Sequence, residues 1–174
     1  MAVSTAAQNM FLGPVYVYYN GMALGRTKGG IEITNSITTA DMSSDQDGIV
    51  DKTITEQSAT VKIPLAEVGL QNLASVTGFT FQQKSTAQVV AIKSLIGIRA
   101  SSNAYPLILK KPSQTTLGTP STNENDWITF PYAWPDGNIT LKYSNEQTIY
   151  EATFFAVPDS NNVRYYVGSM GAYS

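Results

Sequence analysis

The sequence contains no cysteine and no histidine. Without cysteine there can be no disulfide, no thiolate metal site and no thiol nucleophile. Without histidine the chain lacks the commonest general base, a frequent metal ligand and the side chain that usually titrates near neutral pH. A Ser-His-Asp triad is therefore impossible. We expect no catalytic site, no metal site and no cofactor.

Charge is also scarce: 14% of the residues are charged, against about 25% in an average soluble domain. The formal net charge is −2 and the isoelectric point is about 5.0. No basic run is longer than Lys110-Lys111. Proteins that hold nucleic acid tightly need clustered Lys and Arg, so this composition argues against specific nucleic-acid binding.

Long apolar runs are missing as well. Stretches such as Tyr105 to Leu109 are much shorter than the roughly 20 residues that cross a bilayer as a helix. The first nine residues lack the basic and apolar regions of a secretory signal. We expect no membrane insertion and an unprocessed chain that is made in the cytoplasm.

The 174 residues fit one domain, 1–174, and most of them show strand patterns. Val15 to Tyr19 ends at Asn20-Gly21, the strongest short signal for a hairpin turn. Ile31 to Thr34 alternates, which predicts Ile31 and Ile33 inward and Glu32 outward. Further strands are predicted at 53–63, 79–82, 88–93, 105–111, 127–132, 138–143, 148–157 and 163–167.

These short strands predict a mainly β protein: a sandwich or barrel of antiparallel strands. Pro64 and a spaced series of leucines predict one short flanking helix over 65–76. Residues 38–52 are polar and acidic without periodicity and predict a long inter-strand loop, and 112–125 predicts a loop or arm. Ile54 has the wrong parity for the strand that carries Ala59, Val61 and Ile63, which predicts a bulge between Ile54 and Ala59.

Several motifs suggest other functions. The acidic loop aligns partly with a calcium-binding EF-hand, but the glutamate at the last ligand position is missing. The glycines from Gly25 to Gly30 form no dinucleotide or P-loop fingerprint, and left-handed turns explain them better. Trp127, Tyr132 and Trp134 are compatible with a monomeric carbohydrate-binding module or with an aromatic core. A hydrolase that uses two carboxylates stays open, although nothing in the sequence selects a pair.

The N-terminal half resembles the major tail tube proteins of siphophages, the phages with long non-contractile tails. The similar segments, in order, are Gly13 to Val17, Leu24 to Ile33, Asp45 to Asp51, Thr53 to Ile63, Pro64 to Glu67 and Asn72-Leu73. The order and spacing of these segments carry the resemblance. Contractile tail tube proteins and head-tail joining proteins share the same fold and are the related alternatives.

The resemblance implies a structural virion protein whose subunits form hexameric rings, which stack into a tube. The implied partners are further copies of the chain, a tape-measure protein, and tail terminator and tail tip proteins. Assembly would take place in the cytoplasm of the bacterial host and the product would be the virion tail. DNA would pass through the lumen during ejection without specific binding, because a mildly acidic wall repels phosphate.

The resemblance also gives candidate site residues. The predicted loop would contact an adjacent subunit or ring through Asp41, Asp45, Asp47 and Asp51. The polar faces of the first strands predict a lumen-facing set, which is Glu32, Glu56, Ser58 and Thr60. Ordinary solvent exposure is the alternative for these four side chains.

Overall fold

The computed structural model describes residues 15–44, 48–65, 69, 71, 74, 80–84, 86–91, 96–97, 99–116, 118–136 and 150–173. The strands are β1 (Tyr16–Tyr19), β2 (Met22–Arg26), β3 (Glu32–Ser44), β4 (Gly48–Leu65), β5 (Thr80–Lys84), β6 (Ala87–Ala91), β7 (Tyr105–Lys110), β8 (Trp127–Pro135), β9 (Tyr150–Val157) and β10 (Tyr166–Val167). Three short 3₁₀ helices are η2 (Ala100–Asn103), η3 (Glu124–Asp126) and η4 (Met170–Tyr173). The prediction of a mainly β, antiparallel fold is confirmed.

The predicted hairpin turn joins β1 to β2. Asn20 and Gly21 have φ angles of 49° and 76°, and Tyr19 pairs with Met22 across the turn. Two consecutive residues with positive φ are the mark of the turn type that matches the twist of a hairpin. Asn and Gly adopt this conformation at low cost, so the local sequence fixes this corner.

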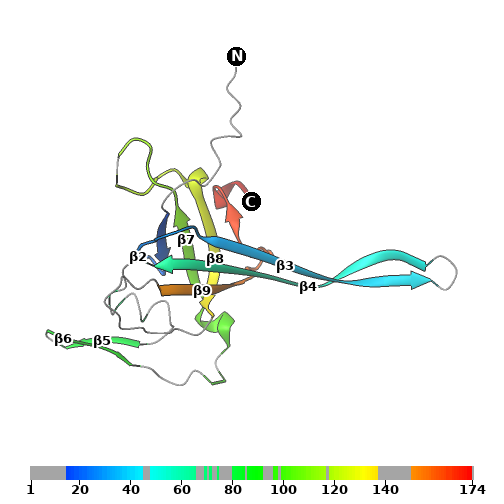
Figure 1. The fold of residues 1–174 in the computed structure, drawn as a ribbon, viewed down its shortest axis with the longest axis horizontal. Coiled ribbons are helices and arrows are strands. Elements are labelled where there is room, and N and C mark those ends of the chain that lie inside the picture. The colour runs from blue at the N-terminus through cyan, green and yellow to red at the C-terminus, as the bar shows by residue number, and fades with distance from the viewer. Residues whose placement is uncertain are drawn as a thin grey trace, which may run out of the picture.

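The strands form one curled sheet in the order β2-β1-β7-β8-β9-β4-β3, with β10 added beside β8. An antiparallel bridge from Thr27 to Leu65, with a hydrogen bond from Lys28 N to Pro64 O, connects the end of β2 to β4. The chain from β2 to β3 therefore lies along one side of β4. The sheet curls into a small barrel-like body, in which this bridge connects the β2 side of the strand order to β4 (Figure 1).

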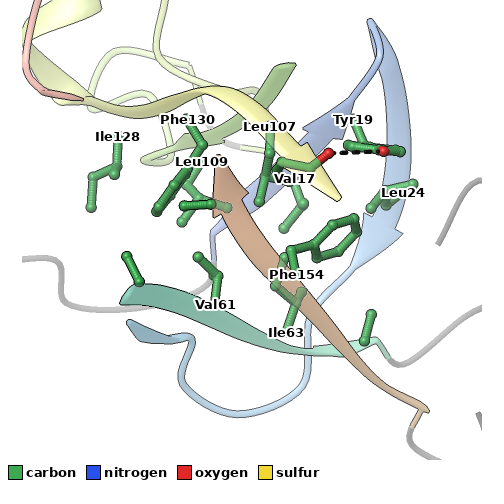
Figure 2. Close-up of a cluster of buried hydrophobic side chains, with 14 of the residues drawn as sticks. Val17, Tyr19, Leu24, Val61, Ile63, Leu107, Leu109, Ile128, Phe130 and Phe154 are labelled. Atoms are coloured by element: carbon green, nitrogen blue, oxygen red, sulfur yellow. Dashed lines mark hydrogen bonds between the residues drawn. The ribbon is translucent and has the colours of Figure 1, made fainter. Parts of the chain in front are cut away.

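The core fills the inside of this barrel. Its largest fully buried side chains come from six strands; they are Phe130, Phe154, Leu24, Ile63, Leu65, Leu107, Leu109, Val17 and Val61. All of them except Leu65 are labelled in Figure 2, where they converge. Tyr19 is also buried, and its hydroxyl donates a hydrogen bond to Ala133 O (3.1 Å). Burial raises the pKa of Tyr19. Ile31 and Ile33 pack against this cluster, as predicted.

The prediction of a long loop over 38–52 is wrong. Residues 38–44 belong to β3 and residues 48–52 to β4, and the two strands pair from Glu32 and Lys62 out to Ser44 and Gly48. Alternation of apolar and polar residues signals a strand only where one face is buried. At residues 38–42 and 51–52 both faces are exposed, so this part of the ladder forms without that pattern.

The predicted bulge is confirmed. Thr38 pairs with Glu56, while Thr39 pairs with Ile54, so Thr55 is an extra residue on β4. Its hydroxyl donates to Thr38 O (3.2 Å). A second irregularity follows nearer the tip, between Met42 and Ser43.

The other predicted elements have mixed outcomes. The helix predicted over 65–76 lies mostly outside the described residues: Leu65 ends β4, and Gln71 and Ala74 are helical. The strand predicted at 138–143 also lies outside them. In the described part of 112–123, the chain is a loop in which Ser113 N donates to Thr119 O (2.8 Å), and η3 begins at Glu124. No helix in the described ranges has the length and apolar character needed to cross a membrane.

Candidate functional site: the β3–β4 arm

The outer parts of β3 and β4 extend well beyond the barrel. Strand β9 pairs with β4 only from Thr60 to Leu65, so the hairpin beyond that point has no third strand beside it in the described structure. We call residues 36–58 the arm. Figure 1 shows the arm as a long two-stranded projection from one side of the body. Side chains 36–42 and 51–57 are all exposed.

One face of the arm continues the core face of the barrel. Ile33 pairs with Val61. Four residues further along β3, Ile37 pairs with Gln57 and lies on the same face, because side chains alternate along a strand. The extra residue Thr55 corrects the parity of β4, so that Ile54 opposite Thr39 lies on this face too. Ile37 and Ile54 are 54% and 60% exposed. We call Ile37 and Ile54 the apolar stripe; it extends the barrel's apolar face into a region without cover from the described chain.

The opposite face brings together the predicted lumen-facing residues. Glu32 pairs with Lys62, Thr60 with Thr34, Ser58 with Ser36 and Glu56 with Thr38, and all of these positions alternate onto one face. Glu32 and Glu56 are exposed, and Ser58 and Thr60 are half-buried. The four residues therefore form one continuous polar face that runs from the barrel onto the arm.

The four predicted contact aspartates do not form one cluster in the described structure. Asp41 and Lys52 are directly paired and form an ion pair (Nζ to Oδ1, 3.4 Å) on the apolar-stripe face. Asp51 is paired with Met42 on the other face, and its carboxylate accepts from Lys52 N (2.7 Å). Asp45 and Asp47 lie outside the described residues.

The base of the arm is held by residues that sequence reasoning did not identify. The Arg164 guanidinium donates to Ala156 O at the end of β9 (2.9 Å) and to Gln57 O on β4 (2.5 Å). Asn35 on β3 donates through Nδ2 to the Tyr165 hydroxyl (2.6 Å). Arg164 and Gln57 are 107 residues apart in the sequence, and Asn35 and Tyr165 are 130 residues apart. No local pattern in the sequence predicts these two contacts.

Arg164 and Tyr165 are presented by a turn that is organised around Asp159. One carboxylate oxygen of Asp159 accepts from the amides of Asn161 (2.8 Å) and Val163 (2.9 Å), and the other accepts from the Tyr166 hydroxyl (2.6 Å). The Tyr166 hydroxyl, followed by the Val163 amide, lowers the pKa of Asp159. The same hydrogen bond to Asp159 raises the pKa of Tyr166.

The two tryptophans of β8 do not form one stacking surface. Trp127 and Trp134 stand at opposite ends of this strand, seven residues and so about 23 Å apart. Lys110 Nζ lies 3.8 Å from the centroid of the Trp127 ring, and the Trp127 indole N–H donates to Ser121 O (2.9 Å). Trp127 thus has a structural role beside Lys110, and a sugar site would have to use one of the two indoles alone.

The described residues contain no group of three or more acidic side chains placed to hold a metal ion. The calcium alternative rests on Asp45 and Asp47, which lie outside them. Gly25 and Gly29 have φ angles of 100° and 106°, which is the left-handed conformation expected for backbone turns. Gly25 lies within β2, where the register with β1 shifts, and Gly29 lies in the connection from β2 to β3.

No protein-family model matches this sequence, and no curated protein matches it. Among solved structures, the chain is similar to one in the cryo-EM structure of the anti-feeding prophage (AFP) baseplate, 6-fold symmetrised. That similarity has 10% sequence identity and a TM-score of 0.35, and it covers 82% of this chain and 85% of the other. A similarity of this extent concerns the path of the backbone alone.

Proposed function

We propose that this protein is a non-enzymatic structural subunit of the tail tube type, which polymerises with copies of itself into stacked hexameric rings. The observation that carries the proposal is the arm: an exposed β-hairpin whose apolar stripe continues the barrel core. The ordered resemblance of residues 13–78 to tail tube proteins supports the same function.

The arm needs a partner for physical reasons. A two-stranded hairpin without a packed face is marginally stable in water. Both outer edges of the arm carry backbone groups that no described strand pairs, and such edges join readily to other strands. Pairing around a closed ring would use these groups and would remove the exposed edges.

Charge segregation supports a second copy of this chain as the partner. Residues 36–58 contain five acidic residues and one lysine, a net charge of −4. The rest of the chain contains ten basic and eight acidic residues, a net charge of +2. The arm of one copy is therefore attracted to the body of another, which also steers their encounter.

The polar face suits a surface along which DNA passes. Glu32, Glu56, Ser58 and Thr60 lie on that face together with Asp51 and Lys62, and the three carboxylates outweigh the one ammonium and disfavour phosphate contacts. In this proposal the apolar stripe faces a neighbouring subunit and the polar face lines the lumen. The completed tube would enclose a tape-measure protein, end at terminator and tip proteins, and conduct DNA in the virion.

Electron microscopy tests the proposal directly. The purified protein is concentrated, viewed by negative stain and measured by light scattering. A hexameric ring would weigh about 113 kDa, six times the 18.8 kDa of one chain. Hollow tubes are the expected product; single rings would favour a head-tail joining role, and an 18.8 kDa monomer at all concentrations would contradict self-assembly.

The proposed contact role of the acidic residues predicts the behaviour of a charge reversal. Asp45→Lys with Asp47→Lys replaces two negative charges by two positive ones in the arm, so we expect tubes to be lost while the subunit keeps its melting temperature. Asp136→Lys with Glu151→Lys makes the same net change at exposed positions of the barrel and serves as the control. Normal tubes from the arm variant would contradict the contact role.

A further inference from the structure

The direction of the arm is not set by the arm itself. Beyond the pairing with β9, the part of the chain that the structure describes places no third strand beside the hairpin to fix its angle. A twisted two-stranded ribbon bends easily because its strands lack flanking partners. A fixed direction therefore requires contacts at the base of the arm.

Both strands of the arm base contact one short loop. The loop of residues 158–165 follows β9, reaches β4 through Arg164 and reaches β3 through Tyr165. The two contacted residues, Gln57 and Asn35, are within two positions of each other across the hairpin, since Asn35 pairs with Ala59. We call this set of contacts the arm clamp.

Arg164 extends the sheet at the point where β9 stops. Phe155 is the last β9 residue paired with β4, and Arg164 then bridges the next β9 carbonyl, Ala156 O, to Gln57 O on β4. A guanidinium has several donors in a rigid planar fork, so it can hold two carbonyl oxygens at a fixed separation. Lysine has a single flexible ammonium and cannot reproduce this geometry.

Tyr165 fixes the other strand and is itself anchored in the core. Its ring packs against Phe130, with centroids 5.2 Å apart, while its hydroxyl accepts from Asn35. Asp159 holds the loop that presents both side chains through three hydrogen bonds. A continuous series of contacts thus runs from the barrel core to both strands of the arm.

We propose that Arg164 and Tyr165, presented by the Asp159 turn, are positioning residues that set the angle of the arm relative to the barrel and so the placement of the arm on a neighbouring copy. This inference rests on the proposed function for its biological consequence. Its structural content concerns the single subunit and can be tested without assembly.

The test measures the arm's direction in the monomer. The native chain has no cysteine, so Ala40→Cys on the arm and Thr122→Cys on the body, both exposed, give two unique labelling positions. Spin labels at these positions report their distance distribution by double electron-electron resonance under dilute conditions. We expect one narrow population in the otherwise native chain and loss of that population in Arg164→Ala.

Two milder variants keep the test decisive if Arg164→Ala does not fold. Arg164→Lys retains the charge and Tyr165→Phe retains the ring, and we expect each to broaden the distribution while leaving the melting temperature of the barrel close to native. Arg99→Ala, which removes an arginine from another exposed position, is the matched control and should leave the distribution unchanged.

The outcomes separate the two proposals. Distributions that stay narrow in folded Arg164 and Tyr165 variants would overturn the arm clamp, whatever the native chain assembles into. A native chain that forms no rings or tubes would contradict the proposed function, even if the clamp variants broaden as expected. Broadened distributions together with irregular or absent tubes would support both.

Discussion

Asp159 shows how much a single residue can organise when its hydrogen bonds are all local. Its carboxylate is the acceptor for two backbone amides and one phenol, within a stretch of eight residues. Hydrogen bonds to a charged acceptor are stronger than neutral ones. The turn that carries Arg164 and Tyr165 therefore depends on the ionised state of one side chain.

This dependence predicts an effect of pH. The folded-state pKa of Asp159 lies below its usual 3.8, so the carboxylate stabilises the fold above about pH 4 and loses that effect as pH falls through the lowered pKa. The pKa of Tyr166 lies above its usual 10.0, so its contribution is present below about pH 10 and is lost as pH rises through the raised pKa. We expect Asp159→Asn to melt at a lower temperature than the native chain at pH 7, with a difference that shrinks on acidification.

Thermal melts of both chains across the acidic range check this prediction. Asp136→Asn removes a carboxylate at another exposed position and is the control for the loss of one charge. A difference between the native chain and Asp159→Asn that stays constant down to acidic pH would contradict the assigned role.

Among the strands, the extra residue Thr55 in β4 decides that both isoleucines of the apolar stripe lie on the same face of the arm. Side chains alternate along a strand, so a shift of one residue moves every following side chain to the other face. The bulge at Thr55 keeps Ile54 on the same face as Ile37 and the core residue Ala59. Because of this bulge, the arm has its two isoleucines on one face and the polar face on the other.

Exchanging Thr53 and Ile54 is expected to disrupt this arrangement. Thr53 pairs with Ala40 on the polar face, so Thr53→Ile with Ile54→Thr moves the isoleucine to that face without changing the composition. The barrel residues Ala59, Val61 and Ile63 are unaffected by the exchange, so we expect a melting temperature within a few degrees of native together with loss of tubes. Circular dichroism and electron microscopy measure the two properties.

A substitution at Thr55 is the control for the exchange. Thr55→Ala retains the extra residue and hence the faces, and it should assemble. Normal tubes from the exchange variant would show that the apolar stripe does not contribute to assembly.

At the scale of the whole molecule, the weak net charge conceals a division into an acidic arm and a basic remainder. The arm carries −4 and the rest +2, so copies of the chain attract one another through unlike parts while the arms repel. Two arms are thus disfavoured as mutual partners, and an arm-to-body contact is favoured. Such a contact joins different surfaces of the two copies, and repeating it produces rings or open filaments.

Salt should therefore weaken assembly. The screening length falls from about 10 Å at 0.1 M salt to about 3 Å at 1 M, which removes most attraction between exposed charges. We expect the protein concentration at which light scattering first reports assembly to rise with NaCl over this range. Assembly that is favoured by salt would instead indicate that the apolar stripe dominates and would contradict charge-guided pairing.

Local signals predicted much of the barrel. The Asn20-Gly21 turn, the inward positions Ile31, Ile33, Ala59, Val61 and Ile63, and the bulge beyond Ile54 follow from dipeptide preference and period-two alternation, which are properties of neighbouring residues. The prediction of a loop over 38–52 is wrong for a related reason. A strand that is exposed on both faces has no buried side to impose alternation, so its sequence resembles that of a loop.

The absence of thiol and imidazole chemistry, the strand-rich class and the uneven distribution of charge follow from composition and short-range pattern, which are written in the chain. The folded structure adds that β3 and β4 continue outward as one arm, that their register joins the polar faces of the two strands into one, and that Arg164 and Tyr165 contact the base of the arm. These features depend on strand register and on contacts between residues more than a hundred positions apart, which local preferences do not specify.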